Sequence, residues 1–112
     1  MQIDDHDAAY LWDMLQACRE IATFSAGMEQ EAFLQDRKLV LAVERCLEII
    51  GEAAGHVSDG LRESQTDVPW RKIRGMRNIL AHEYGQVNYE IVYKTVMNEI
   101  PELRVMLEKL LP

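Results

Sequence analysis

A short basic segment late in the chain holds residue types that could do chemistry on a phosphate group. Between residues 68 and 82 there are four cations and no acid: Arg71, Lys72, Arg74 and Arg77. Asn78 follows Arg77 directly, and His82 closes the segment. An arginine is always charged and binds phosphate oxygens through several N–H donors, and a histidine can take or give a proton near neutral pH. The segment therefore predicts an anion site.

A site of this composition can cleave RNA without a metal ion. When the 2′-hydroxyl of a ribose attacks the adjacent phosphorus, a histidine can transfer the proton, which typically contributes about 10²–10⁴-fold to the rate. An arginine can stabilise the negative charge that builds on the phosphoryl oxygens. In such a site Arg77 and His82 would be the catalytic candidates, and Asn78 and Arg74 would be substrate-phosphate or supporting residues.

The spacing of these residues limits how one helix can present them. On a helix of 3.6 residues per turn, Arg74, Asn78 and His82 share one stripe. Arg77 and His82 are five positions apart, roughly 140° round an ideal α-helix, so an isolated helix does not aim both at one point. They converge where the helix end unwinds, or across a two-fold axis that places two copies side by side. Both arrangements stay open.

The same residues also fit a plainer interpretation. A basic stretch on a helix is commonly a solvated face, and a tyrosine such as Tyr84 is commonly a residue that serves packing. Taken without any resemblance to known proteins, the pattern predicts a helical protein with a local anion site and no particular reaction.

Length and composition place the segment in an otherwise acidic protein. The 112 residues, 48% apolar and 28% charged, predict one folded domain spanning residues 1–112. Net charge is −7, yet residues 1–67 hold five basic and fourteen acidic side chains, so the cations are concentrated in one place. No apolar run approaches the roughly 20 residues of a membrane span, and the first residues lack the layout of a signal peptide. We expect a cytoplasmic protein with no membrane partner.

Two other groups of reactive residues are given structural interpretations. Cys18 and Cys46 fall within apolar helical patterns and are expected to be buried, reduced thiols. His6 lies among the aspartates of residues 4–7, but consecutive residues rarely converge on one ion. We therefore expect a flexible acidic start, no metal site and no cofactor.

Apolar residues recur at three- and four-residue steps along most of the chain, which predicts helices. The expected long helices run from about Asp5 to Phe24, from the cap Asp36 to about Val57, from Pro69 to near Tyr84, and from the cap Asn88 onward with a kink or division at Pro101. Residues 29–34 are expected to form a short turn and residues 61–68 a loop or one helical turn. Gly51 within the second long helix suggests close helix packing there. The expected fold is an all-α, antiparallel bundle of four to five helices.

The string RNILAHEY at residues 77–84 resembles the HepT-like branch of the HEPN superfamily. It matches that branch's motif of an arginine, four residues, a histidine, one residue and a tyrosine, here Arg77, His82 and Tyr84. Residues 68–76 before it agree, as do residues 7–11, 33–36, 47–54 and 87–93 in the same order. At Asn88 and Tyr93 the family would have aspartate and tryptophan, and both departures lie outside the motif.

The resemblance implies an oligomeric state, an activity and a partner. Members of the family are all-α homodimers with motifs from both subunits at a shared cleft, and many are metal-independent endoribonucleases that act as toxins on RNA such as tRNA or mRNA. Their usual partner is a minimal nucleotidyltransferase antitoxin, in a type VII-like toxin–antitoxin pair. It transfers AMP from ATP to the motif's tyrosine, here Tyr84. The bulky anionic adduct would occupy the place of substrate phosphate. The alternative is a non-catalytic nucleotide- or partner-binding module that keeps the fold.

Overall fold

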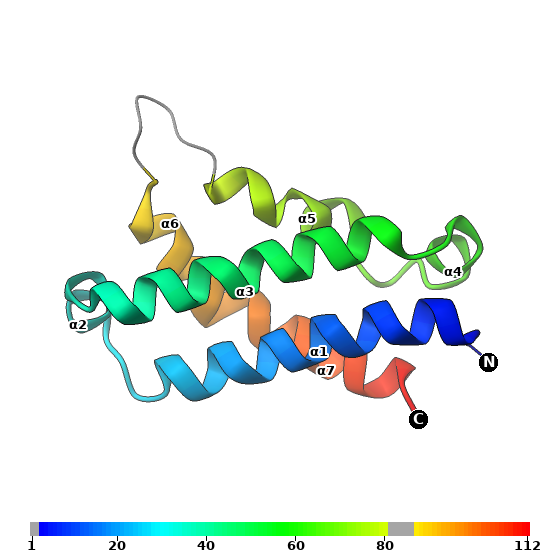
Figure 1. Ribbon diagram of the computed structural model, residues 1–112, viewed down its shortest axis with the longest axis horizontal. Helices are drawn as coiled ribbons and strands as arrows, with labels where there is room; N and C mark the ends of the chain where they lie inside the picture. The colour runs from blue at the N-terminus through cyan, green and yellow to red at the C-terminus, as the bar shows by residue number, and fades with distance from the viewer. Residues whose placement is uncertain (1–2, 81–86) are drawn as a thin grey trace.

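The structure, a computed structural model, describes residues 3–80 and 87–112, and within these ranges every regular element is helical. The prediction of an all-α fold is confirmed. The elements, labelled as in Figure 1, are α1 (Asp5–Ser25), α2 (Gln30–Gln35), α3 (Arg37–His56), α4 (Asp59–Ser64), α5 (Trp70–Arg74), the 3₁₀ segment η1 (Gly75–Leu80), α6 (Tyr89–Lys94), the π-helical segment η2 (Thr95–Glu99) and α7 (Ile100–Leu110).

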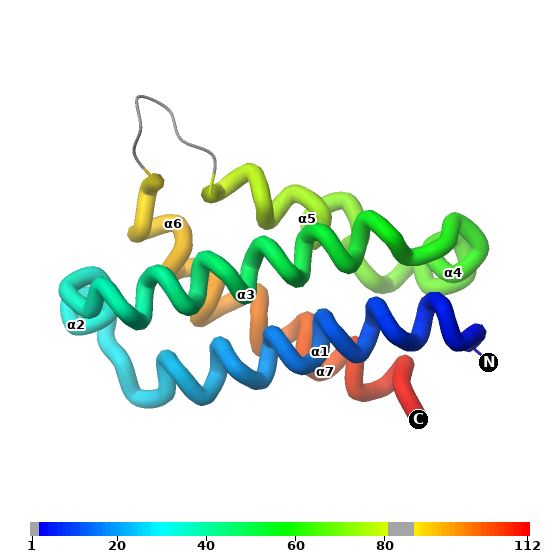
Figure 2. The backbone as a smooth tube through the Cα atoms, in the orientation of Figure 1, coloured from blue at the N-terminus to red at the C-terminus, as the bar shows by residue number. Residues whose placement is uncertain are grey.

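Two long antiparallel helices, α1 and α3, organise the molecule (Figure 1). Helix α7 packs against α1, and α5 with η1 contacts α3, as the backbone trace in Figure 2 also shows. The predicted antiparallel bundle is therefore present. Its core is built from the helical apolar stripes recognised in the sequence, and the largest side chains with no exposed surface include Leu11, Met14, Phe33, Leu47, Ile50 and Leu107.

Side-chain caps fix where the long helices begin. The carboxylate of Asp4 accepts a hydrogen bond from the Asp7 amide at 2.8 Å, and that of Asp36 accepts one from the Leu39 amide at 3.0 Å. The Asn88 side chain accepts from the amides of Glu90 and Ile91. These bonds satisfy donors that have no partner inside the helix. The caps at Asp36 and Asn88 were predicted from the sequence, which also indicated an aspartate cap for the first helix and left it open between Asp4 and Asp5.

The expectation of one continuous α-helix from Pro69 is wrong. Pro69 lies just before the five-residue helix α5, and the chain tightens into the 3₁₀ segment η1 at Gly75. In a 3₁₀-helix residues three apart lie above one another. Trp70 and Ile73 in α5 and Met76 in η1 are spaced three apart and are all buried, so the apolar face stays on the core across the change in winding. The expected end near Tyr84, with Gly85 beyond it, lies outside the described residues.

The last long helix is divided, as its proline predicted. Residues Thr95–Glu99 form a π-turn in which the Ile100 amide donates to the Thr95 carbonyl, five residues back. Pro101 follows and has no N–H to donate, so the wider turn comes immediately before it. Helix α7 then continues and buries Leu103 and Leu107 against the core.

Both cysteines are free and buried, as predicted. Burial raises the pKa of Cys18 to about 12 and that of Cys46 to about 11. At neutral pH these thiols are therefore protonated and poor nucleophiles. None of the described helices is long and apolar enough to cross a membrane.

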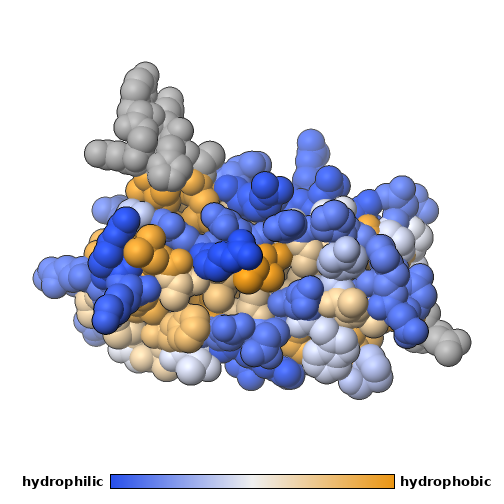
Figure 3. Space-filling model, viewed as in Figure 1, coloured by the Kyte–Doolittle hydropathy of each residue, from blue (hydrophilic) through white to orange (hydrophobic). Residues whose placement is uncertain are grey.

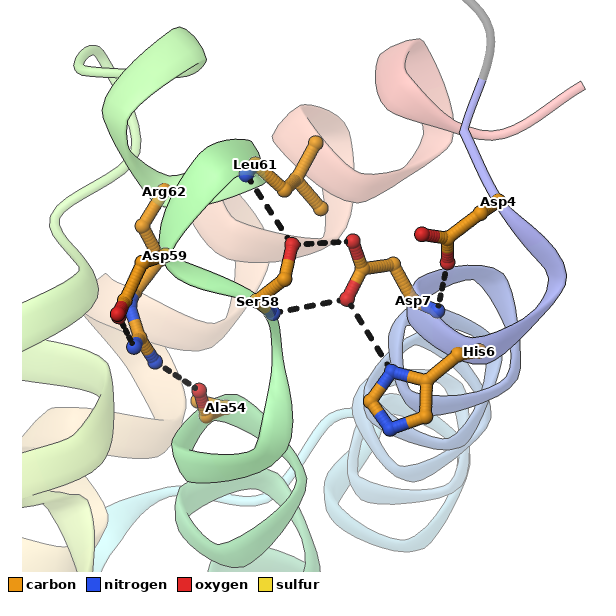
Figure 4. A network of polar contacts seen from close by, with 8 residues as sticks. All are labelled: Asp4, His6, Asp7, Ala54, Ser58, Asp59, Leu61 and Arg62. Carbon is orange, nitrogen blue, oxygen red and sulfur yellow. Dashed lines mark hydrogen bonds and ion pairs between the residues drawn. The ribbon is translucent and has the colours of Figure 1, made fainter.

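The acidic start of the chain is ordered, contrary to expectation. Asp7 is only 4% exposed, and its carboxylate accepts two hydrogen bonds from Ser58, from the amide at 2.8 Å and from the hydroxyl at 2.6 Å. His6 Nδ1 lies 3.6 Å from the same carboxylate, and Asp4 caps the helix beside it (Figure 4). Ser58 in turn caps α4 by accepting from the Leu61 amide. Asp7 therefore ties the first turn of α1 to the junction between α3 and α4.

These hydrogen bonds also set the protonation of Asp7. Desolvation by burial raises the pKa of its carboxyl, but the bonds from Ser58 and the contact with His6 outweigh that effect, and the net pKa lies below the ordinary 3.8. Because the folded-state pKa is depressed, the ionised carboxylate stabilises the fold at pH values above the unfolded pKa. That stabilisation is lost as the pH falls through the folded pKa.

We predict that Asp7→Ala lowers the free energy of unfolding by about 1–3 kcal/mol at pH 7, because it leaves the Ser58 donors without their acceptor. Asp5→Ala, in the same helical turn but exposed, is the matched control and should cost less. Urea unfolding at several pH values measures both. The difference in the free energy of unfolding between wild type and Asp7→Ala should decrease below pH 4. A difference that does not change with pH would contradict a stabilising role of the ionised Asp7 carboxylate.

Candidate functional site

Two glycines one turn apart on α3 let another segment of the chain lie unusually close. A Cβ placed on Gly51 would come within 2.5 Å of the Arg77 Cγ and 3.1 Å of its Cδ. A Cβ on Gly55 would lie 3.9 Å from the Arg74 Nε. The arginine stems therefore rest on bare backbone of α3. The close packing that Gly51 suggested in the sequence is confirmed, and the partner is the basic segment itself.

The buried side of the basic segment fixes the direction of its cations. Trp70, Ile73 and Met76 face the core, and the Trp70 indole N–H donates to the Gln65 carbonyl at 2.9 Å. Arg71, Arg74 and Arg77 each follow one of these residues by a single position and are exposed. Because both sets repeat every three residues, the turn of α5 and η1 places the apolar set inward and the arginines together on another side.

A cleft of about 880 Å³ lies between α3 and the basic segment. Hydrophilic side chains gather over α5, whereas hydrophilic and hydrophobic patches alternate along α3 (Figure 3). Within residues 3–80 and 87–112, the residues that line the cleft belong to these two walls: Gly51, Glu52, Gly55, His56, Trp70, Arg71, Arg74, Gly75, Arg77 and Asn78. The structure thus places three of the predicted site residues, Arg74, Arg77 and Asn78, in the lining of one cleft.

The cations of the segment are sorted between two surfaces. Lys72 points away from the cleft and its Nζ lies 3.2 Å from the Glu99 carboxylate. Among the described residues no carboxylate forms an ion pair with Arg71, Arg74 or Arg77. Arginine binds phosphate oxygens in a planar, two-pronged geometry, so the three guanidinium groups and the amide donor give this cleft the chemistry of a candidate phosphate site.

The opposite wall carries residues of another kind. Glu52 and His56, one turn apart on α3, are exposed and line the cleft together with the glycines. The carboxylate of Glu52 repels phosphate, so the anion-binding side of the cleft is the side formed by α5 and η1. The two walls of the cleft therefore differ in charge: one carries the arginines, and the other carries a carboxylate and an imidazole.

Two of the predicted site residues, His82 and Tyr84, lie outside the described residues, and the cleft is described without them. The sequence argument missed Arg71, Glu52 and His56 as lining residues. It treated the whole segment as one α-helix, whereas the chain winds as a 3₁₀-helix from Gly75 onward. The signal was present in the sequence as the paired repeats of apolar residues and arginines.

Comparison with known proteins identifies relatives along most of the chain. The family model described as "Ribonuclease HepT-like" matches residues 14–110. "Putative RNase TTE0752" of Caldanaerobacter subterraneus subsp. tengcongensis is 42% identical over 102 residues, which cover 91% of each chain. "Putative RNase MJ1216" of Methanocaldococcus jannaschii is 38% identical over 92% of this chain and 85% of its own. "Probable ribonuclease HepT" of Thermococcus cleftensis is 39% identical over 90% of this chain and 92% of its own. No solved structure matches.

We predict that Gly51→Ala is tolerated only when Arg77 is shortened. In the wild-type background the new Cβ meets the Arg77 stem, so the substitution should lower the free energy of unfolding by about 1–3 kcal/mol, as overpacking does. In an Arg77→Ala background that obstacle is gone, and alanine should stabilise the helix by up to about 1 kcal/mol. Urea unfolding of wild type, the two single variants and the double variant measures the coupling energy between Gly51→Ala and Arg77→Ala.

Gly60→Ala is the matched control for the gain in helix propensity, because a Cβ on Gly60 meets no atom within 4 Å. It should raise stability slightly in both backgrounds. An effect of Gly51→Ala that is the same with and without the Arg77 side chain would show that the arginine does not rest on Gly51.

Proposed function

Because this chain belongs to the HepT-like ribonuclease family, we propose that it is a metal-independent endoribonuclease and the toxin of a type VII-like toxin–antitoxin pair. The observation that carries the proposal is the arginine cleft over Gly51 and Gly55, a site built to hold a phosphate. Leu80 ends the described part of the basic segment, and His82 follows it by two residues in the chain. The substrate is RNA, such as tRNA or mRNA, and we place the protein in the cytoplasm.

The proposed reaction uses the 2′-hydroxyl of the substrate as nucleophile. Its oxygen forms a bond to the adjacent phosphorus while the bond from phosphorus to the 5′-oxygen breaks. The products are a 2′,3′-cyclic phosphate and a free 5′-hydroxyl. His82 transfers protons between the attacking and leaving oxygens. Arg77 stabilises the charge on the non-bridging oxygens, with Arg74 and Asn78 holding the phosphate. No metal or cofactor is required for these steps.

We further propose that two copies of the chain share the active site. A homodimer whose two-fold axis passes beside the cleft would bring Arg77 and His82 of both copies to the same phosphate. This arrangement answers the difficulty that the two residues, five apart in sequence, pose for one helix. The exposure of Arg77 and Asn78 leaves them accessible to a second copy and to RNA.

We predict that the purified protein cleaves single-stranded RNA in the presence of EDTA, and that Arg77→Ala and His82→Ala each lower the rate by at least about 10²-fold, the scale of one lost proton-transfer or charge-stabilising group. Lys72→Ala is the matched control, because Lys72 pairs with Glu99 outside the cleft. Gel electrophoresis of a labelled RNA and detection of the cyclic phosphate end measure the reaction.

The variants also test the shared site. Mixing Arg77→Ala with His82→Ala protein after unfolding and refolding should restore part of the activity, since a mixed dimer holds one intact copy of each residue. Cleavage that persists equally in wild type and both variants would contradict the assignment. An inactive wild type that still binds RNA would favour the non-catalytic binding module.

We predict that Tyr84 is the point of control. A minimal nucleotidyltransferase antitoxin incubated with the protein and ATP should add the mass of AMP to the peptide that contains Tyr84, and Tyr84→Phe should remain unmodified. The adduct places a phosphate two residues from His82, where it competes with substrate. Mass spectrometry of the peptide and a cleavage assay measure both effects. Modified protein with full ribonuclease activity would rule out this mode of control.

A further inference from the structure

The arginine cleft continues past α3 onto α1. Glu52 and His56 line both the cleft and a second cavity of about 270 Å³, whose other lining residues are Tyr10, Asp13, Ile49 and Ala53. His56 is the last residue of α3 and stands at the boundary between the two spaces. A ligand that enters the arginine cleft therefore meets the imidazole of His56 before it reaches α1.

The second cavity contains a stack of rings. The His56 imidazole lies nearly parallel to the Tyr10 ring, with centroids 5.0 Å apart and an angle of 16° between the planes. His6 meets the Tyr10 ring edge-on at 5.1 Å. In a stacked pair each ring has one face toward its partner, and the His56 side chain, which is exposed, also lines the arginine cleft. The geometry suits the addition of a further planar group to the stack.

The stack is held by the hydrogen bonds around Asp7. Tyr10 lies one turn after Asp7 on α1, and Ser58 lies two residues after His56. The two bonds from Ser58 to the Asp7 carboxylate therefore fix the two backbones that carry the rings, and His6 contacts both Asp7 and Tyr10 (Figure 4 shows the Asp7 contacts). A platform fixed in this way loses little freedom when a base stacks on it.

Charge orients a nucleotide in the cleft. Its phosphate is drawn to the guanidinium groups and repelled by Glu52, so the sugar and base must lie toward α3. The Arg74 Nε passes 3.9 Å from the Cβ position of Gly55, the residue next to His56. Arg74 and His56 both line this cleft, so a nucleotide whose phosphate binds Arg74 can place its base against the imidazole of His56.

We propose that the Tyr10–His56 stack is a base-binding subsite, on which the base of the nucleotide whose phosphate binds Arg74 lies against the His56 ring. The inference rests on the proposed ribonuclease function and adds to it the means by which single-stranded RNA is held. Every base has a flat π-face, so the subsite accepts all four bases and excludes a base that is paired within a duplex stack. His56 is a positioning residue for substrate and takes no part in the bond changes.

The experiment measures the affinity of the full chain carrying His82→Ala, so that RNA is bound without being cut, for a fluorescently labelled oligoadenylate. His56→Ala should weaken binding roughly 5- to 100-fold, the range of one lost base–aromatic contact. His56→Phe keeps a flat ring and should restore affinity to within about 3-fold of the parent. Trp12→Ala is the matched control, because Trp12 is an aromatic residue of α1, 42% exposed, that lines neither cavity.

A set of oligonucleotides, each lacking one base at a different position, locates the contact. At the stacked position, the losses of affinity caused by the missing base and by His56→Ala should not be additive, because both changes remove the same contact. Loss of affinity with both His56→Ala and His56→Phe would overturn the proposal, since it would assign His56 to the charge or hydrogen bonding of phosphate. Equal affinity of His56→Ala and its parent would overturn it as well, as would equal effects on every oligonucleotide.

The outcome is separable from that of the ribonuclease proposal. If wild-type protein cleaves RNA and His56→Ala does not change the affinity, the base subsite is contradicted and the ribonuclease proposal stands. If wild-type protein binds oligoadenylate through His56 but cuts no RNA, the ribonuclease proposal is contradicted and the base subsite stands. A parent that does not bind oligoadenylate at all overturns the subsite, because stacking of this kind tolerates any sequence.

Discussion

The absence of a side chain at Gly51 is the constraint on which the cleft depends. A Cβ at this position would lie within 2.5 Å of the Arg77 stem, so no other residue allows the basic segment to approach α3 so closely. The approach has two consequences. It lets Trp70, Ile73 and Met76 reach the core, and it holds the arginines at fixed height above the helix backbone. Packing and ligand binding are thus set by the same contact, which is why a change in either is expected to disturb the other.

The charge distribution suits a protein that must bind RNA selectively. A net charge of −7 disfavours indiscriminate adsorption to polyanions, which basic proteins show. Against that background the guanidinium groups of Arg71, Arg74 and Arg77 form a confined positive site, while Lys72 is neutralised by Glu99. Under the proposed function, affinity comes from phosphate contacts inside the cleft and the acidic surface repels nucleic acid that cannot enter it. The same acidic surface remains available to a protein partner.

Much of the fold could be predicted from the sequence because its signals are local. The long stripes of α1 and α3, the caps at Asp4, Asp36 and Asn88, and the division before Pro101 each depend on residues within a few positions of one another. The winding of residues 75–80 was missed because the buried residues of this segment, Met76 and Leu80, are four positions apart, a spacing that equally fits an α-helix. Tyr10 and His56 are far apart in the chain, and the Asp7–Ser58 hydrogen bonds hold their helices together. No local sequence pattern predicts this ring contact.

The central claim, that RNA phosphate binds in the cleft above Gly51 and Gly55, is tested most directly by nuclear magnetic resonance. Of the six glycines, Gly51 and Gly55 lie under the arginines, whereas Gly27 and Gly60 line no part of the cleft, so their backbone amide signals distinguish the two regions. Titration of the His82→Ala protein with a short single-stranded RNA should shift the signals of Gly51 and Gly55 in proportion to binding and leave those of Gly27 and Gly60 in place. Saturable binding that shifts Gly27 or Gly60 while Gly51 and Gly55 stay unchanged would contradict the account.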